Sequence, residues 1–126
     1  MTTAGGPRRI QRRRTLGWRM PANTVYVGRG SIWANPFRVG APRGDWLPPL
    51  RAAQAVRLYE RWLTGAAAQP PHGVARAVIL ANLHQLRGKD LACWCPLVDM
   101  HANPVPCHAE VLLRLANTQN PTPRQG

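Results

Sequence analysis

The chain has 126 residues and a formal net charge of +12, from 17 basic and five acidic residues. This length allows one domain with a modest core. No run approaches the roughly 18 apolar residues of a membrane helix, and the Gly- and Arg-rich N-terminus lacks the apolar segment of a secretory signal. An odd number of cysteines, three, argues against a secreted disulfide scaffold. We therefore expect a cytoplasmic protein that has no membrane partner.

The positive charge is concentrated near the N-terminus, because residues 1–44 carry nine arginines and no acidic residue. Residues 1–9 have no apolar pattern, which predicts a disordered tail. A dense basic run follows, made of Arg8, Arg9, Arg12, Arg13, Arg14 and Arg19. Such runs bind polyanions through phosphate contacts that weaken as salt rises. The alternative is a solvated segment that keeps the protein soluble.

The first predicted strand is Thr24–Val27, a β-branched and aromatic run between turn residues. A tight polar loop follows at 28–31, and Asn35-Pro36 marks a turn. Residues 37–39 form a candidate second short strand. The Gly- and Pro-rich stretch 40–49 is predicted to be a loop.

Helices dominate the second half of the prediction. Apolar residues recur at three- and four-residue steps over 51–64 and over 75–86, where the second helix ends at Gly88. A strand over 90–94, a loop and a helix over 107–116 complete the pattern. We expect a single small α/β domain over 10–117, with the order β–(β)–α–α–β–α, a short mostly parallel or mixed sheet and about three helices. Residues 118–126 are predicted to be a disordered C-terminal tail.

All three cysteines lie near the end of the last predicted strand and the start of the last predicted helix. Cys93 and Cys95 share a face if the strand continues through both, and Cys107 with His108 would complete a Cys₃His zinc site. The spacing is not the usual one for zinc. Adjacent residues on a helix also point about 100° apart, which makes joint ligation by Cys107 and His108 awkward.

Two other interpretations of these residues stay open. Cys107 at a helix N-terminus, beside His108, has the setting of a reactive thiolate, so the pair is a candidate catalytic set. A covalent nucleophile also needs an oriented base and an oxyanion site. In the third interpretation the cysteines are small buried hydrophobic residues that only pack in the core.

The loop after the first strand has the composition of a phosphate-binding loop, although it lacks the third glycine of the dinucleotide motif. Arg29, Ser31 and backbone N–H groups could bind a phosphate, and Asn35 could hydrogen-bond a base. In a parallel sheet this loop would share an edge with the segment after Cys93. The sequence therefore predicts one pocket built from both segments.

Four separated motifs resemble the uncharacterised family described as domain of unknown function 4326, found in actinobacteria and their phages. They are Arg13–Pro21, Val27–Phe37, Leu86–Leu97 and Pro106–Ala109. The resemblance implies that residues 10–21 belong to the domain, so that Arg13, Arg14 and Arg19 would line the same edge as Arg29. It implies no established activity.

Our leading hypothesis is a module that binds a phosphate-bearing partner, a nucleic acid or a nucleotide, in a basic pocket at the strand ends. The ligand-binding residues would be Arg13, Arg14, Arg19, Arg29, Ser31 and Asn35. One alternative is an enzyme that acts on a nucleotide-like substrate, with Cys107 and His108 catalytic. The other is a zinc-stabilised interaction module with the ligands Cys93, Cys95, Cys107 and His108.

Overall fold

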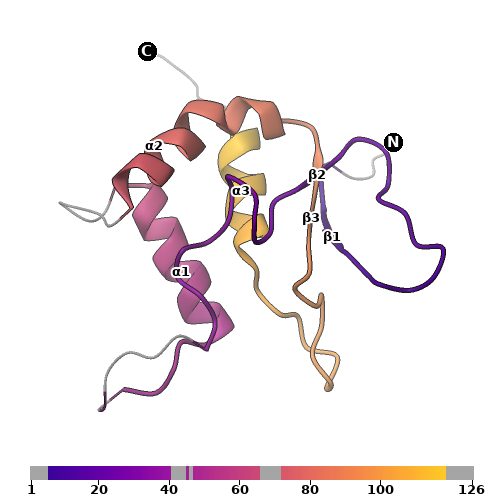
Figure 1. Cartoon of the computed structure of the whole chain (residues 1–126), viewed down its shortest axis with the longest axis horizontal. Helices are drawn as coiled ribbons and strands as arrows, with labels where there is room; N and C mark the ends of the chain where they lie inside the picture. Colours follow the sequence, from indigo (N-terminus) through magenta and orange to yellow (C-terminus); the bar gives the residue numbers. More distant parts are fainter. Residues whose placement is uncertain (1–5, 41–44, 46, 66–71, 119–126) are drawn as a thin grey trace.

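A computed structural model of the chain describes residues 6–40, 45, 47–65 and 72–118 (Figure 1). The helices and strands, in chain order, are β1 (Arg9–Gln11), β2 (Thr24–Tyr26), α1 (Ala52–Leu63), α2 (Gly73–Asn82), the 3₁₀ helix η1 (Leu83–Leu86), β3 (Asp90–Cys93) and α3 (His108–Asn117). The order β–β–α–α–β–α confirms the predicted α/β class. No helix in the described part of the chain is long and apolar enough to cross a membrane.

The sheet has three strands in the order β1-β3-β2, and both strand pairs are parallel. β3 takes the centre because its residues Leu91, Ala92 and Cys93 are all buried, as is usual for strands covered on both faces. Since all three strands are parallel, the loops that follow them leave from the same edge of the sheet. Ligands bind at this edge in open parallel sheets.

One predicted strand is wrong. Residues 37–39 form no strand, and Phe37 instead packs its ring edge-on against Trp62 at 6.1 Å between centroids. The additional strand is Arg9–Gln11, whose first residue is the last one of the predicted N-terminal tail. Its pairing with β3 continues on both sides, since Leu91 N donates to Arg8 O at 3.0 Å and Arg12 N donates to Cys93 O at 2.8 Å. Of the tails predicted at 1–9 and 118–126, residues 1–5 and 119–126 lie outside the described residues.

The three helices supply most of the core. α3 packs against both the sheet and α1, so it forms the middle layer of the domain (Figure 1). Tyr59 and Trp62 of α1, Ile79 of α2 and Leu112 of α3 are buried and belong to one apolar cluster. The second predicted helix is divided into α2 and η1 and ends near Gly88, whose φ of +76° is readily adopted only by glycine.

Candidate functional site

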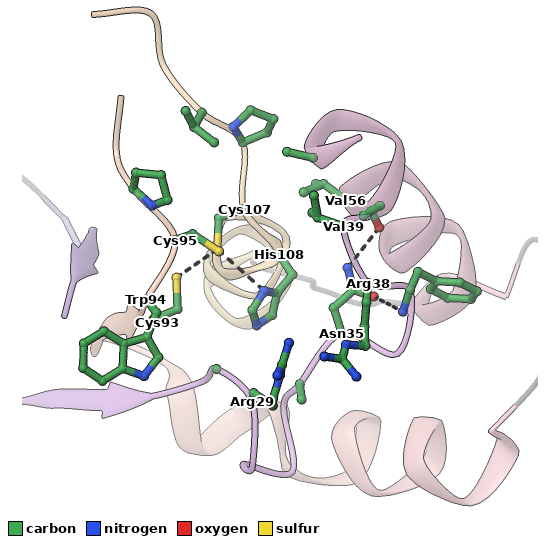
Figure 2. Close-up of a pocket in the computed structure, with 18 of the residues that line it drawn as sticks. Arg29, Asn35, Arg38, Val39, Val56, Cys93, Trp94, Cys95, Cys107 and His108 are labelled. Carbon is green, nitrogen blue, oxygen red and sulfur yellow. Dashed lines mark hydrogen bonds between the residues drawn. The ribbon is translucent and has the colours of Figure 1, made fainter. Parts of the chain in front are cut away.

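A pocket of about 860 Å³ opens at the edge of the sheet where the strands end (Figure 2). Its wall comes from five segments: Arg14 in the segment after β1, the end of β2 with the loop that follows, the first turns of α1, the segment after β3, and the start of α3 with the residues before it. Figure 2 shows the cysteine sulfur atoms on one side of this space, and Asn35 and Arg38 across from them. Cys93, Cys95, Cys107 and His108 all line it. The predicted convergence of the two loops on one pocket is therefore present.

The three thiols come together although two chain segments supply them. Cys93 ends β3, Cys95 follows two residues later, and Cys107 is the residue that caps α3. The sulfur atoms of Cys93 and Cys107 lie 3.0 Å apart, and all three sulfur atoms lie within 4.8 Å of one another. This group could hold a metal ion, because cysteine sulfur is a preferred ligand of zinc and other soft metals.

Cys107 and His108 converge in spite of being neighbours in the sequence. Cys107 has an extended backbone, with φ −147° and ψ 149°, because it precedes the first turn of α3. The divergence of about 100° applies only between residues inside a helix, so it does not apply to this pair. The Cys107 sulfur lies 3.6 Å from Nδ1 of His108. His108 nevertheless stands outside the group of atoms that lie within 4.8 Å of one another, which consists of the three sulfurs.

The His108 ring is held firmly in the wall of the pocket. Its Nε2 lies 2.6 Å from the carbonyl oxygen of Val27, and Tyr59 packs edge-on against the ring at 5.3 Å between centroids. A carbonyl can only accept, so Nε2 carries the proton and Nδ1 presents its lone pair toward Cys107. Burial lowers the pKa of His108, which keeps the ring neutral. This is the arrangement found in histidines that bind a metal and donate their other N–H to the backbone.

The pKa values of the three thiols are shifted in different directions. Hydrogen bonds from Cys107 and Cys93 lower the pKa of Cys95 to about 2. The bond to Cys107 lowers the pKa of Cys93, but the bond to Cys95 and burial outweigh it and raise the pKa to about 11. Hydrogen bonds to Cys93 and Cys95, followed by burial, raise the pKa of Cys107. Of the three thiols, half-buried Cys95 is therefore the one that loses its proton most readily.

Sequence reasoning missed the part that Arg9 plays at this site. Its guanidinium donates to the carbonyls of Val105 at 2.7 Å and Pro96 at 2.9 Å, and it lies 3.9 Å from the Glu110 carboxylate. Only 7% of its side chain is exposed. These two carbonyls belong to the two ends of the loop that separates Cys95 from Cys107. Arg9 thereby fixes the distance between the segments that carry the thiols.

Other arginines surround the mouth of the pocket. Arg14, Arg29 and Arg38 line it, and all three side chains are exposed. Within the described residues, only Arg9 and Arg114 form ion pairs with carboxylates. No aspartate or glutamate in the described part lines the pocket. The mouth therefore keeps its positive charge and can attract an anion.

The aromatic rings of Tyr26 and Trp94 lie beside Arg12 and Arg14. The Arg12 guanidinium lies over Tyr26 at 4.8 Å and over Trp94 at 4.7 Å, and the Arg14 guanidinium lies 4.9 Å from the Trp94 ring. Tyr26 donates its hydroxyl hydrogen to the carbonyl of Arg29 at 2.9 Å. Gly28 is needed for this contact, since a Cβ at that position would lie 2.6 Å from the Tyr26 hydroxyl oxygen.

Four of the six residues predicted to bind phosphate are not placed to do so. Two lie outside the pocket wall, and the polar groups of the other two form hydrogen bonds within the protein. Arg13 and Arg19 are exposed and lie outside its wall. The Ser31 hydroxyl donates to the Gly28 carbonyl at 2.6 Å, in a turn of its own loop. Asn35 does line the pocket, but its amide donates to Ala55 O at 3.0 Å and accepts from Phe37 N at 2.8 Å. Ser31 and Asn35 thus hold the loop in shape.

The comparison with protein families gives one result. The model of the family described as domain of unknown function 4326 matches residues 10–118. The chain belongs to this family. Neither the curated proteins nor the solved structures contain a match to it. Because the family's description assigns no activity, the function has to be argued from the pocket itself.

Proposed function

We propose that this domain of unknown function 4326 binds a phosphate-bearing ligand, a nucleotide or a nucleic-acid strand, in the pocket at the strand ends. The observation that carries the proposal is the set of three arginines at the mouth, Arg14, Arg29 and Arg38, which have no carboxylate partner among the described residues. Guanidinium groups bind phosphate through paired, charge-assisted hydrogen bonds. Their exposure leaves the donors available to a ligand.

The rest of the pocket favours a ligand with a flat, apolar part. Tyr26, Phe37 and Trp94 lie in the wall together with aliphatic side chains. Nucleobases stack on aromatic rings and on guanidinium planes, and such stacking tolerates different bases. A nucleotide combines this flat part with the phosphate that the arginines would bind.

A fluorescein-labelled oligothymidylate tests the proposal by fluorescence anisotropy over a series of salt concentrations. We expect binding that weakens steeply with salt, and competition by inorganic pyrophosphate. Arg29→Ala and Arg38→Ala should each weaken binding and reduce the slope of log K against log salt by about one. Arg57→Ala, an exposed arginine of α1 outside the pocket, is the matched control. Absent binding, or an equal loss in the Arg57 variant, would contradict the proposal.

The second component of the proposal is a zinc ion held by Cys93, Cys95, Cys107 and His108. At zinc–sulfur and zinc–nitrogen distances of about 2.3 and 2.0 Å, two tetrahedral ligands lie about 3.8 Å apart for a sulfur pair and about 3.5 Å apart for sulfur and nitrogen. The separation of 3.6 Å between the Cys107 sulfur and His108 Nδ1 is close to the second value. The Cys93 and Cys107 sulfurs, at 3.0 Å, would have to separate by less than about 1 Å.

Metal analysis of protein purified without chelator tests the zinc site. We expect close to one zinc per chain, and cobalt substitution should produce thiolate-to-metal charge-transfer absorption. Cys95→Ser and His108→Ala should lower the zinc content. His101→Ala, which changes an exposed histidine of the neighbouring loop, should not. A stable protein without metal would overturn this component, while the phosphate component would remain to be judged by its own binding test.

We do not propose covalent catalysis by Cys107. Only 2% of this residue is exposed, its sulfur contacts Cys93, and in the metal-free protein its bonds to the other two thiols and its burial raise the pKa of its thiol. An activated nucleophile needs the opposite properties, accessibility and a lowered pKa. His108 is likewise engaged on both ring nitrogens.

A further inference from the structure

We propose that metal binding and ligand binding at this pocket are coupled through Trp94. A metal ion held by Cys93 and Cys95 would fix the Trp94 ring, and the ring, with Arg12 beside it, would fix Arg14 where it can bind phosphate. The inference rests on the proposed function, since it requires both a metal and a phosphate-bearing ligand. It adds that the metal regulates affinity for the ligand.

The first step of the argument is the position of Trp94 between two thiols. The ladder of β3 ends at Cys93, whose carbonyl accepts from Arg12 N at 2.8 Å. Trp94 and Cys95 lie beyond the strand, and Trp94 is 38% exposed. A metal bound to the side chains on either side would restrict the backbone at Trp94. The ring would then keep one position.

The second step is the contact between this ring and the arginines. In the described part of the chain, no hydrogen bond or ion pair holds the Arg14 side chain, and its guanidinium lies over the Trp94 ring at 4.9 Å. Arg12 is held between Trp94 and Tyr26. Long exposed side chains lose rotamer freedom when they bind a ligand, so a fixed ring that orders them beforehand raises affinity.

The third step is thermodynamic linkage. If zinc raises the affinity for the ligand by some factor, the ligand raises the affinity for zinc by the same factor. Two stacking contacts of the strength usual at exposed sites correspond to about a five- to thirty-fold effect. The size of the coupling is therefore measurable with two independent titrations.

The test is a thermodynamic cycle on the full chain, with labelled oligothymidylate at fixed salt. Zinc-loaded wild type should bind the probe about five- to thirty-fold more tightly than metal-free wild type. In Trp94→Leu, which keeps all four proposed zinc ligands, this ratio should fall to about one. Trp18→Leu is the matched control, because Trp18 belongs to the same basic segment and lies outside the pocket wall. Its ratio should equal that of wild type.

A second measurement needs no folded metal-free protein. Saturating oligothymidylate should slow the release of zinc to a chelator in wild type and in Trp18→Leu, but not in Trp94→Leu. The inference would be overturned if, in wild type, zinc did not change the affinity for the probe and the probe did not change the release of zinc. It would also be overturned if Trp94→Leu showed the same coupling as wild type. Either result would leave the two binding functions intact. Failure of wild type to bind zinc would instead refute the zinc component of the proposed function, and failure to bind the probe would refute its phosphate component.

Discussion

The wall of the pocket that carries the thiols and the mouth that carries the arginines differ in burial and in bonding partners. In the wall, Cys107 and His108 are buried, and Arg9, which bonds to wall residues from outside the pocket, has a nearly buried side chain; each has specific partners among neighbouring groups. At the mouth, Arg29 and Arg38 are exposed and have no carboxylate partner among the described residues. Groups with satisfied partners hold a structure in place, whereas unsatisfied charges are available to something else. We therefore expect substitutions in the wall to change stability, and substitutions at the mouth to change affinity.

Removal of the metal should have the largest effect on stability. With free zinc at about 1,000 times the dissociation constant, a bound ion contributes about 4 kcal/mol to the free energy of unfolding. For a domain of this size, that corresponds to a fall in Tm of about 15–25 °C after chelation. Thermal unfolding at several free zinc concentrations measures the effect. A Tm that does not depend on zinc would mean that packing alone maintains the wall.

Arg9→Met should produce the next largest effect. The substitution keeps much of the apolar stem but removes the charged donors to Pro96 O and Val105 O. Losing two such bonds in a nearly buried place costs about 3 kcal/mol. Urea unfolding of the metal-free protein measures it, with Arg8→Met as the control, because Arg8 is the exposed neighbour on the same strand end. Equal losses in both variants would show that Arg9 contributes only charge.

The prominence of Arg9 illustrates what the sequence could and could not reveal. α1, α3 and β3 are predictable because their apolar residues repeat with the period of a helix or form a short buried run. β1 has the sequence Arg-Ile-Gln and carries no such pattern. It is a strand because β3 lies beside it, about 80 residues further along the chain. Pairing of this kind is set by tertiary structure rather than by local composition.

The site was predictable to a similar extent. The end of a parallel strand and the start of a helix correctly indicate that Cys93 and Cys107 meet. The convergence of Cys107 and His108 depends on the backbone angles of a capping residue, which composition does not specify. Of six residues predicted to bind phosphate, Arg14 and Arg29 line the pocket with exposed side chains. Long arginine side chains reach in many directions, so their order in the sequence is a poor guide to where they gather.

Acidification should lower the free energy of unfolding by a smaller amount, through His108 in the wall of the pocket. Burial lowers the pKa of His108 below its usual 6.5, so the unfolded chain binds a proton that the folded, metal-free protein does not. The stability that comes from this difference is complete above pH 6.5 and is lost as the pH falls through that value, by at most about 1.4 kcal/mol per pH unit. Urea unfolding between pH 5.5 and 7.5 measures the slope. His108→Gln should reduce it, and the exposed His101→Gln should leave it unchanged.

Substitutions at the mouth should have the smallest effect on stability. Arg29→Ala and Arg38→Ala remove exposed side chains that form no ion pair within the described part of the chain, so the free energy of unfolding should change by less than about 0.5 kcal/mol. The change should be toward greater stability at low salt, because each substitution reduces repulsion in a chain of net charge +12. Urea unfolding at low and high salt measures this, beside the loss of affinity for oligothymidylate. A large loss of stability in either variant would mean that the mouth is structural, and it would remove the main argument for a ligand there.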